Sequence, residues 1–120
     1  MKNFRKLEIW KRSRQLAIDC YQLTDALPKN EMYGLVSQMN RCAVSISSNI
    51  AEGCARSSDL ELKRFIEIAL GSAFELETQL SIASEIYKID TNNFQNELTQ
   101  IQKMINAYRT KLKKTPNTKY

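Results

Sequence analysis

Residues 59–88 read DLELKRFIEIALGSAFELETQLSIASEIYK, and the spacing of their apolar side chains decides the fold class. These side chains recur every three or four residues, which is the period of one face of an α-helix. The apolar positions are Leu62, Ile66, Ala69, Ala73, Leu76, Leu80, Ala83 and Tyr87. Ser58 and Glu61 fit a capping box, in which the two side chains satisfy free N–H groups at a helix start. A long amphipathic helix is therefore predicted over residues 59–88.

Three further segments show the same period and are also predicted to be helices. They cover residues 5–27, 31–52 and 92–113. The connections between the four segments are short, and short connections place consecutive helices side by side in opposite directions. At 120 residues the chain has room for one core. The sequence therefore predicts an all-α protein with a single domain over residues 1–120. We expect an up-down-up-down antiparallel four-helix bundle with a basic C-terminal tail over residues 114–120.

The three cysteines and the end of the second helix carry further predictions. Gly53 is expected in the left-handed conformation just past that helix. Cys54 is then expected in an exposed turn, whereas Cys20 and Cys42 lie on apolar stripes and are expected to pack as small apolar side chains. An odd number of cysteines without an export signal favours reduced thiols and a cytoplasmic location. No strictly apolar run exceeds three residues, so no membrane partner is expected.

The sequence contains no histidine, which excludes many kinds of enzyme. Without histidine there is no Ser/His or Cys/His nucleophile pair, no imidazole base and no histidine metal ligand. A di-iron helix bundle needs Glu-x-x-His pairs. Glu75 and Glu77 point about 160° apart on a helix and cannot converge within one subunit. We therefore expect no enzymatic activity, no catalytic residue, no metal and no cofactor.

The predicted helix over residues 59–88 has more apolar side chains than one bundle core can bury. Relative to the centre of its core face, one group lies about 100° to one side and a second group about 100° to the other. The predicted oligomer interface consists of these residues: Ile68, Ile82 and Ile86 on the first side, Leu70 and Phe74 on the second. A helix that is apolar this far round is usually covered by more protein, which indicates self-association. The alternative is that connections or tilted packing cover these side chains within one subunit.

Gly71 lies in the middle of the same predicted helix. Glycine there costs about 0.5–1 kcal/mol relative to alanine, so something is expected to pack against its backbone. Close approach of another helix is the preferred interpretation, and a ligand pocket is the alternative.

A set of mostly polar and small residues on the two central helices forms a recognisable pattern, with Ser-Ile-Ser-Ser-Asn-Ile-Ala-Glu-Gly at residues 45–53 as its core. The set is Gln38, Arg41, Ser45, Asn49, Glu52, Gly53, Gly71, Ser72 and Glu75. The first five residues of this set line one face of the second predicted helix, and that face could be solvated. If it is buried, Arg41 or Arg56 is expected to pair with Glu52 or Glu75. Over residues 4–112 the chain resembles the small four-helix-bundle proteins encoded in intervening sequences of bacterial 23S ribosomal RNA genes.

This resemblance implies a non-enzymatic protein that assembles into a cyclic homo-oligomer, a homopentamer. It also implies a connection with nucleic acid, because some of the genes lie within ribosomal RNA genes. The fold of the family is similar to that of an accessory protein of diversity-generating retroelements, which works beside a reverse transcriptase. That second argument is an analogy between folds.

Positive charge is concentrated at the two ends of the chain. A net charge of +5 is carried by residues 1–14, and another +5 by residues 109–120. Each segment alone therefore carries as much net charge as the whole chain, whose formal net charge is +5. In the predicted bundle these segments lie at the same end, where they would attract a phosphate backbone. The residues predicted to bind RNA or single-stranded DNA are Lys6, Lys11, Arg12, Arg14, Arg109, Lys111, Lys113 and Lys114.

Aromatic residues accompany this charge: Phe4, Trp10 and Tyr120 are candidates to stack on bases. Two alternatives remain open. Lysines near a helix C-terminus also complement the helix macrodipole, and Trp10 also fits a core position. The protein would then be an interaction scaffold without nucleic-acid binding, which works with an unknown protein partner.

Overall fold

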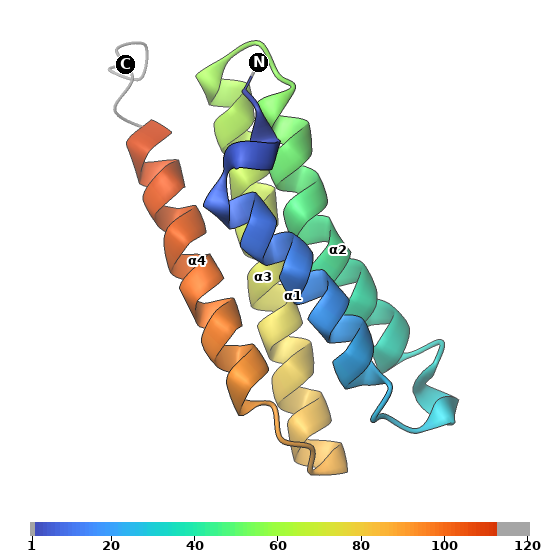
Figure 1. The fold of residues 1–120 in the computed structure, drawn as a ribbon. Helices are drawn as coiled ribbons and strands as arrows, with labels where there is room; N and C mark the ends of the chain where they lie inside the picture. Colours follow the sequence, from blue (N-terminus) through green and yellow to red (C-terminus); the bar gives the residue numbers. More distant parts are fainter. Residues whose placement is uncertain (1, 113–120) are drawn as a thin grey trace.

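The chain forms four α-helices and no strand over residues 2–112, the part that this computed structural model describes (Figure 1). The helices are α1 (Glu8–Thr24), α2 (Leu35–Cys54), α3 (Asp59–Tyr87) and α4 (Asn92–Leu112). Each helix runs antiparallel to the next, and α4 returns alongside α1, so each helix contacts two neighbours (Figure 1). The predicted all-α class is confirmed, and the arrangement is compatible with the predicted four-helix bundle.

Two helices begin later than predicted. The first was expected over 5–27, but Leu7 is extended (φ −80°, ψ 128°) and separates a short 3-10 helix, η1 (Phe4–Lys6), from α1. The second was expected over 31–52, but residues Lys29–Glu31 form a second 3-10 helix, η2, and α2 starts after Gly34. Lys113 and the tail over residues 114–120 lie outside the described residues.

Glu31 fixes the connection between α1 and α2. Its carboxylate accepts a short hydrogen bond from the hydroxyl of Tyr87, at the end of α3. The other carboxylate oxygen accepts the backbone N–H of Leu35 at 3.3 Å, at the start of α2. The connection is therefore tied both to the helix that follows it and to α3.

The predicted start of α3 is confirmed. The Ser58 Oγ accepts the backbone N–H of Glu61 at 3.2 Å, as a capping box requires. At the start of α4 the Asp90 Oδ1 accepts the backbone N–H of Asn92 at 3.0 Å.

The core is formed by the inward faces of all four helices. The largest side chains with less than 2 % exposure are Leu16, Met39, Ile46, Ile50, Ile66, Leu76, Leu80, Leu98, Ile101 and Ile105. Each such side chain contributes about 1.5–3 kcal/mol when it is removed from water. Trp10 is only half-buried and packs edge-on against Phe4, with ring centroids 4.9 Å apart. Both aromatic rings therefore complete the margin of the core.

The end of α2 differs from the prediction. Gly53 lies inside α2, and among the described residues no glycine has a positive φ. Glycine is needed here because an added Cβ would lie 2.9 Å from Leu62 Cδ1 and 2.9 Å from Phe65 Cβ, both on α3. Cys54 was expected to be exposed but is 2 % exposed, since the helix continues through it. Burial raises the pKa of its thiol above the ordinary value.

We predict that Gly53→Ala lowers the free energy of unfolding by about 1–3 kcal/mol, because the new methyl group overpacks the contact between α2 and α3. Chemical denaturation followed by circular dichroism measures the change. Ala51→Gly is the control, since it alters the same helix at a half-buried site and should cost about 1 kcal/mol or less. Unchanged stability of Gly53→Ala would contradict the close approach of α2 to α3 at this point.

Candidate functional site

The charged residues separate towards the two ends of the bundle. The starts of α1 and α3 and the ends of α2 and α4 lie together at one end (Figure 1). With each helix divided at its midpoint, the described residues of this half include twelve Lys and Arg and five Asp and Glu. The opposite half includes three Lys and Arg and eight Asp and Glu. We call the first half the basic end and the second the acidic end.

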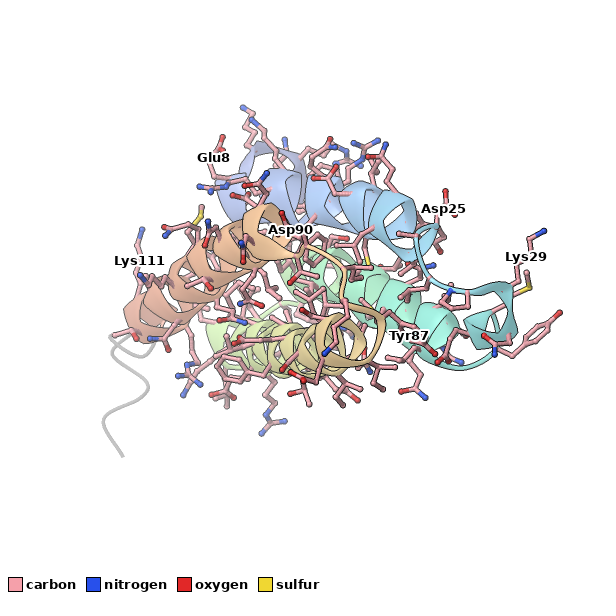
Figure 2. All side chains as sticks on the ribbon, turned by 90° about the horizontal axis from the view of Figure 1, so that it is seen from below. Glu8, Asp25, Lys29, Tyr87, Asp90 and Lys111 are labelled. Atoms are coloured by element: carbon pink, nitrogen blue, oxygen red, sulfur yellow. The ribbon has the colours of Figure 1, made fainter. Side chains whose placement is uncertain are left out.

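Residues at both ends can be followed in Figure 2. Glu8 and Lys111 lie on one side of that view, and Asp25 and Lys29 lie on the other. The cations of the basic end are Lys2, Arg5, Lys6, Lys11, Arg12, Arg14, Arg56, Lys63, Arg64, Lys103, Arg109 and Lys111. Its acidic residues are Glu8, Glu52, Asp59, Glu61 and Glu67. Sequence reasoning missed the contribution of the α2–α3 connection, which only the antiparallel order brings to this end.

Four of the predicted phosphate-binding residues have exposed side chains at the basic end. They are Lys6, Lys11, Arg14 and Lys111. Lys11 lies 3.7 Å from Glu8, and both side chains are mainly exposed, so this pair is weak and leaves Lys11 available. Lys113 and Lys114 lie outside the described residues.

Arg12 is held between two helices. Its Nε and Nη2 donate to the two carboxylate oxygens of Glu97 on α4, at 2.8 and 2.7 Å. These hydrogen bonds hold the pKa of Glu97 below its ordinary value and raise that of Arg12. Both side chains are about one-third exposed. Arg12 therefore joins α1 to α4, and its guanidinium is already occupied.

Arg109 is also engaged within the subunit. Its guanidinium donates to the Asn106 side chain and lies 3.8 Å from Glu67 on α3. Its side chain is 32 % exposed. Like Arg12, Arg109 therefore contributes to contacts between helices, and neither belongs to the free cations of the basic end.

Five of the nine pattern residues meet in a groove between α2 and α3. The groove is lined by Tyr33, Ser37, Gln38, Arg41, Cys42, Ser45, Ser72, Glu75 and Gln79. The hydroxyl oxygens of Ser45 and Ser72 are 2.9 Å apart and hydrogen-bond across the two helices. The Asn49 amide donates to the Ser45 carbonyl at 2.8 Å and to its Oγ at 2.9 Å. Ser45 and Ser72 thus link α2 to α3, and Asn49 supports Ser45 from within α2.

The groove keeps polar groups without partners. Gln79 is 9 % exposed, and its Nε2 donates to Gln38 Oε1 at 3.5 Å, but its own Oε1 has no partner within the described chain. Arg41 and Glu75 are exposed, and neither forms an ion pair within residues 2–112. Of the expected pairs, Arg56 with Glu52 is present at 2.8 Å, at the basic end and outside the groove.

Cys42 faces the same groove and is half-buried, so it packs less completely than predicted. Burial raises the pKa of its thiol, and the carboxylate of Glu75 raises it further. Burial also raises the pKa of Cys20, to about 12. Neither cysteine is therefore a thiolate nucleophile at neutral pH.

The outer face of α3 carries an exposed apolar stripe. Four of the five predicted interface residues belong to it: Ile68 (50 % exposed), Phe74 (53 %), Ile82 (46 %) and Ile86 (58 %). Leu70 does not, because it is 6 % exposed. It lies about 80° from the centre of the core face, whereas Phe74 lies about 120° away. Packing within the subunit therefore covers Leu70, and the other four side chains remain uncovered.

Gly71 lies within this stripe. An added Cβ would have no atom of residues 2–112 within 4 Å, so the helix expected to approach Gly71 is not one of the described helices of the same subunit. A second group of exposed apolar side chains, which sequence reasoning missed, consists of Ile18 and Tyr21 on α1 and Val44 on α2. The spacing of Ile18 and Tyr21 on an otherwise polar face was the available signal.

Within residues 2–112, no three Cys, Asp or Glu side chains are grouped closely enough to hold a metal ion. None of the described helices combines the length and the apolar character needed to cross a membrane.

A protein-family model described as 23S rRNA-intervening sequence protein matches residues 5–107. The match includes all of α1, α2 and α3 and most of α4, together with the groove and the apolar stripe. No curated protein sequence matches the chain.

We predict that Glu97→Gln lowers the free energy of unfolding at pH 7 by about 0.2–1 kcal/mol, because solvent partly screens the pair with Arg12. The folded-state pKa of Glu97 is lowered, so the pair stabilises the fold above the ordinary glutamate pKa. That contribution is lost as the pH falls through the lower folded-state pKa. Thermal unfolding of both proteins from pH 7 to pH 3 measures the difference.

The control for this series is Glu85→Gln, which removes an exposed carboxylate whose contact with Lys88 is 3.6 Å. Its unfolding should differ little from wild type at any pH. A difference between Glu97→Gln and wild type that persists undiminished in acid would contradict the assigned ionic role.

Proposed function

Since the chain belongs to the 23S rRNA-intervening sequence protein family, we propose that it is a non-enzymatic protein that self-associates through α3 and binds RNA or single-stranded DNA with its basic end. The observation that carries the proposal is the separation of charge between the two ends. The described residues of the basic end include twelve Lys and Arg but only five Asp and Glu, although the net charge of the chain is only +5. Such a surface attracts a phosphate backbone.

The position of the cations favours a binding role over helix stabilisation. Lysine and arginine stabilise the end of a helix through its macrodipole but are unfavourable at the start. The basic residues of α4 lie at its end, and the macrodipole alone would account for them. Lys11 and Arg14 lie in the first half of α1, and Lys63 and Arg64 lie in the first two turns of α3. The macrodipole does not explain these four residues, whereas a phosphate ligand does.

Binding by this surface is expected to depend on charge and little on base sequence. The exposed cations sit on helix ends and on η1, and none of the described helices projects to enter a groove of duplex nucleic acid (Figure 1). Phe4 and Trp10 pack on each other, which leaves little aromatic surface for base stacking.

Self-association is supported by the apolar stripe of α3 and by the exposed apolar side chains of Ile18, Tyr21 and Val44 on α1 and α2. Exposed apolar side chains on different helices of one chain suit a head-to-tail interface, which closes into a ring when the rotation between subunits allows it. Gly71 would let the neighbouring backbone approach α3 closely. We propose a cyclic homopentamer, in which the number five rests on the family resemblance alone. Such a ring would set the basic ends side by side.

A second candidate function is a protein-interaction scaffold without nucleic-acid binding. The groove between α2 and α3 favours it, because the buried Gln79 Oε1 lacks a hydrogen-bond donor there. Arg41 and Glu75 at the rim of the groove offer both signs of charge to a polar partner. Retained binding of a protein partner after nuclease treatment, together with no affinity for nucleic acid, would favour this candidate.

We predict that the wild-type protein binds labelled structured RNA or single-stranded DNA, and that Lys6→Glu, Arg14→Glu and Lys111→Glu together weaken binding at least about tenfold. The matched control is Lys29→Glu, Arg41→Glu and Lys88→Glu, which makes the same change in charge at the acidic end. Fluorescence anisotropy from about 50 to 200 mM salt measures the affinity, which should fall steeply with salt. Equal losses in both variants, or no binding at the lowest salt, would overturn the proposed surface.

We predict that Phe74→Glu and Ile82→Glu together convert the oligomer to a monomer with the mass of one chain, 13.9 kDa. Charges on an apolar interface oppose its burial, and both side chains are exposed in the subunit, so folding should persist. Multi-angle light scattering measures the mass, and circular dichroism checks the helix content. Met32→Glu is the control, because Met32 is 52 % exposed and belongs neither to the apolar stripe nor to the second group of exposed apolar side chains. A wild-type protein that is itself monomeric would overturn the proposed assembly.

A further inference from the structure

A cleft opens between α1 and the start of α4, towards the acidic end. Its volume is about 610 Å³. The apolar residues that line it are Leu16, Leu23, Ala26, Ile89 and Phe94. Leu16 and Phe94 are buried and form the floor, while Leu23 and Ile89 are half-buried and Ala26 is exposed. The contact between α1 and α4 is the least extensive of the four contacts between neighbouring helices, which explains why this seam stays open.

Carboxylates stand at the edge of the cleft. Asp19 accepts a hydrogen bond from Gln15 Nε2 at 3.0 Å, and Asp90 accepts the backbone N–H of Asn92 at 3.0 Å. Neither forms an ion pair within the described chain, and the cleft is lined by no lysine or arginine. Glu97 also lines it, but Arg12 occupies both of its oxygens. Figure 2 shows Asp90 beside α1 and α4.

The surroundings increase this negative charge. The described residues of the acidic end include eight Asp and Glu but only three Lys and Arg. A nucleic acid or an acidic peptide would be repelled here, whereas a ligand with an apolar body and positive charges would be attracted. The occupant must therefore combine apolar side chains for the floor with cations for Asp19 and Asp90.

The dimensions of the cleft suit a short helix. The lining residues on α1 run from Leu16 to Leu23, which corresponds to about 10 Å, or two turns of α-helix, and Ala26 extends this wall just past the end of α1. A helix with one apolar face fits a groove between two helices by placing side chains at positions three and four apart on its floor. We propose that this cleft binds a basic amphipathic helix of another protein. The proposal is independent of nucleic-acid binding, which concerns the opposite end of the molecule.

The experiment uses a fluorescein-labelled 14-residue peptide of leucine and lysine in an amphipathic helical pattern, with a leucine and glutamate peptide of the same pattern as the charge control. Anisotropy is measured with the full-length protein. We expect the lysine peptide to bind and the glutamate peptide to fail. Asp19→Asn with Asp90→Asn should weaken binding about fivefold, because two partly exposed ion pairs are lost. Both substitutions retain a side-chain oxygen for the existing hydrogen bonds.

The matched control is Glu75→Gln with Glu85→Gln, which removes two exposed carboxylates of the acidic end outside the cleft and should leave binding unchanged. Ala26→Trp is expected to fill the cleft and weaken binding at least about tenfold, since the apolar floor is then covered. Ala26 is exposed, so the fold tolerates the larger side chain.

Several results would overturn the proposal. They are failure of the lysine peptide to bind, equal losses in the cleft variants and the Glu75/Glu85 control, and no effect of Ala26→Trp. Binding of leucinamide as tightly as the peptide would assign the cleft to a small organic cation instead. Displacement of the peptide by excess Ala26→Trp protein, whose own cleft is filled, would identify a second copy of this chain as the occupant.

Discussion

The close packing of α2 against α3 is the constraint on which the rest of the structure depends. It is the most extensive contact between two helices, and small residues such as Ser45 and Gly53 on α2 and Ser72 on α3 lie at it. Ser45 and Ser72 hydrogen-bond across it at 2.9 Å, and at Gly53 there is no space even for a Cβ. Such close approach fixes the register of the two helices, since a larger side chain would force them apart. α1 then packs on α2, and α4 packs on α3.

The antiparallel order of the helices brings residues of like charge from different helices to the same end of the bundle. α1 is basic at its start and acidic towards its end, and α4 has the reverse order. Because the two helices run in opposite directions, their charges add at each end of the bundle. One end is therefore suited to phosphate groups and the other to cationic ligands. The two proposed binding surfaces are consequences of one topological arrangement.

The uncovered face of α3 connects the subunit to its proposed assembly. A helix that buries one face in its own core and exposes Ile68, Phe74, Ile82 and Ile86 on another has surface available for a neighbour. Gly71, which has no neighbour among the described residues of the subunit, lies on that same face. In a ring built through this face, each copy would contribute its basic end to a common surface, so affinity for a polyanion would rise with the number of copies.

The sequence by itself determined the local features of this protein. The spacing of apolar residues defined the four helices, Ser58 and Glu61 marked the start of α3, and the basic residues of both chain ends were visible as counts. These features depend on residues a few positions apart, whose relative geometry is set by the helix itself. Five residues of the sequence pattern line one groove, but the spacing within each helix could not show that α2 and α3 would form it together.

Only the tertiary structure decided which side chains are free. Arg12 and Glu97 are 85 positions apart. Their ion pair engages the guanidinium of Arg12, which the sequence alone predicted to bind nucleic acid. Packing also buried Leu70 and Cys54 and gave Gly53 a steric role instead of a conformational one. The cleft between α1 and α4 likewise exists only because α4 closes the bundle incompletely. The physical reason is common to all these cases: such contacts depend on the register and tilt of neighbouring helices, which local periodicity does not specify.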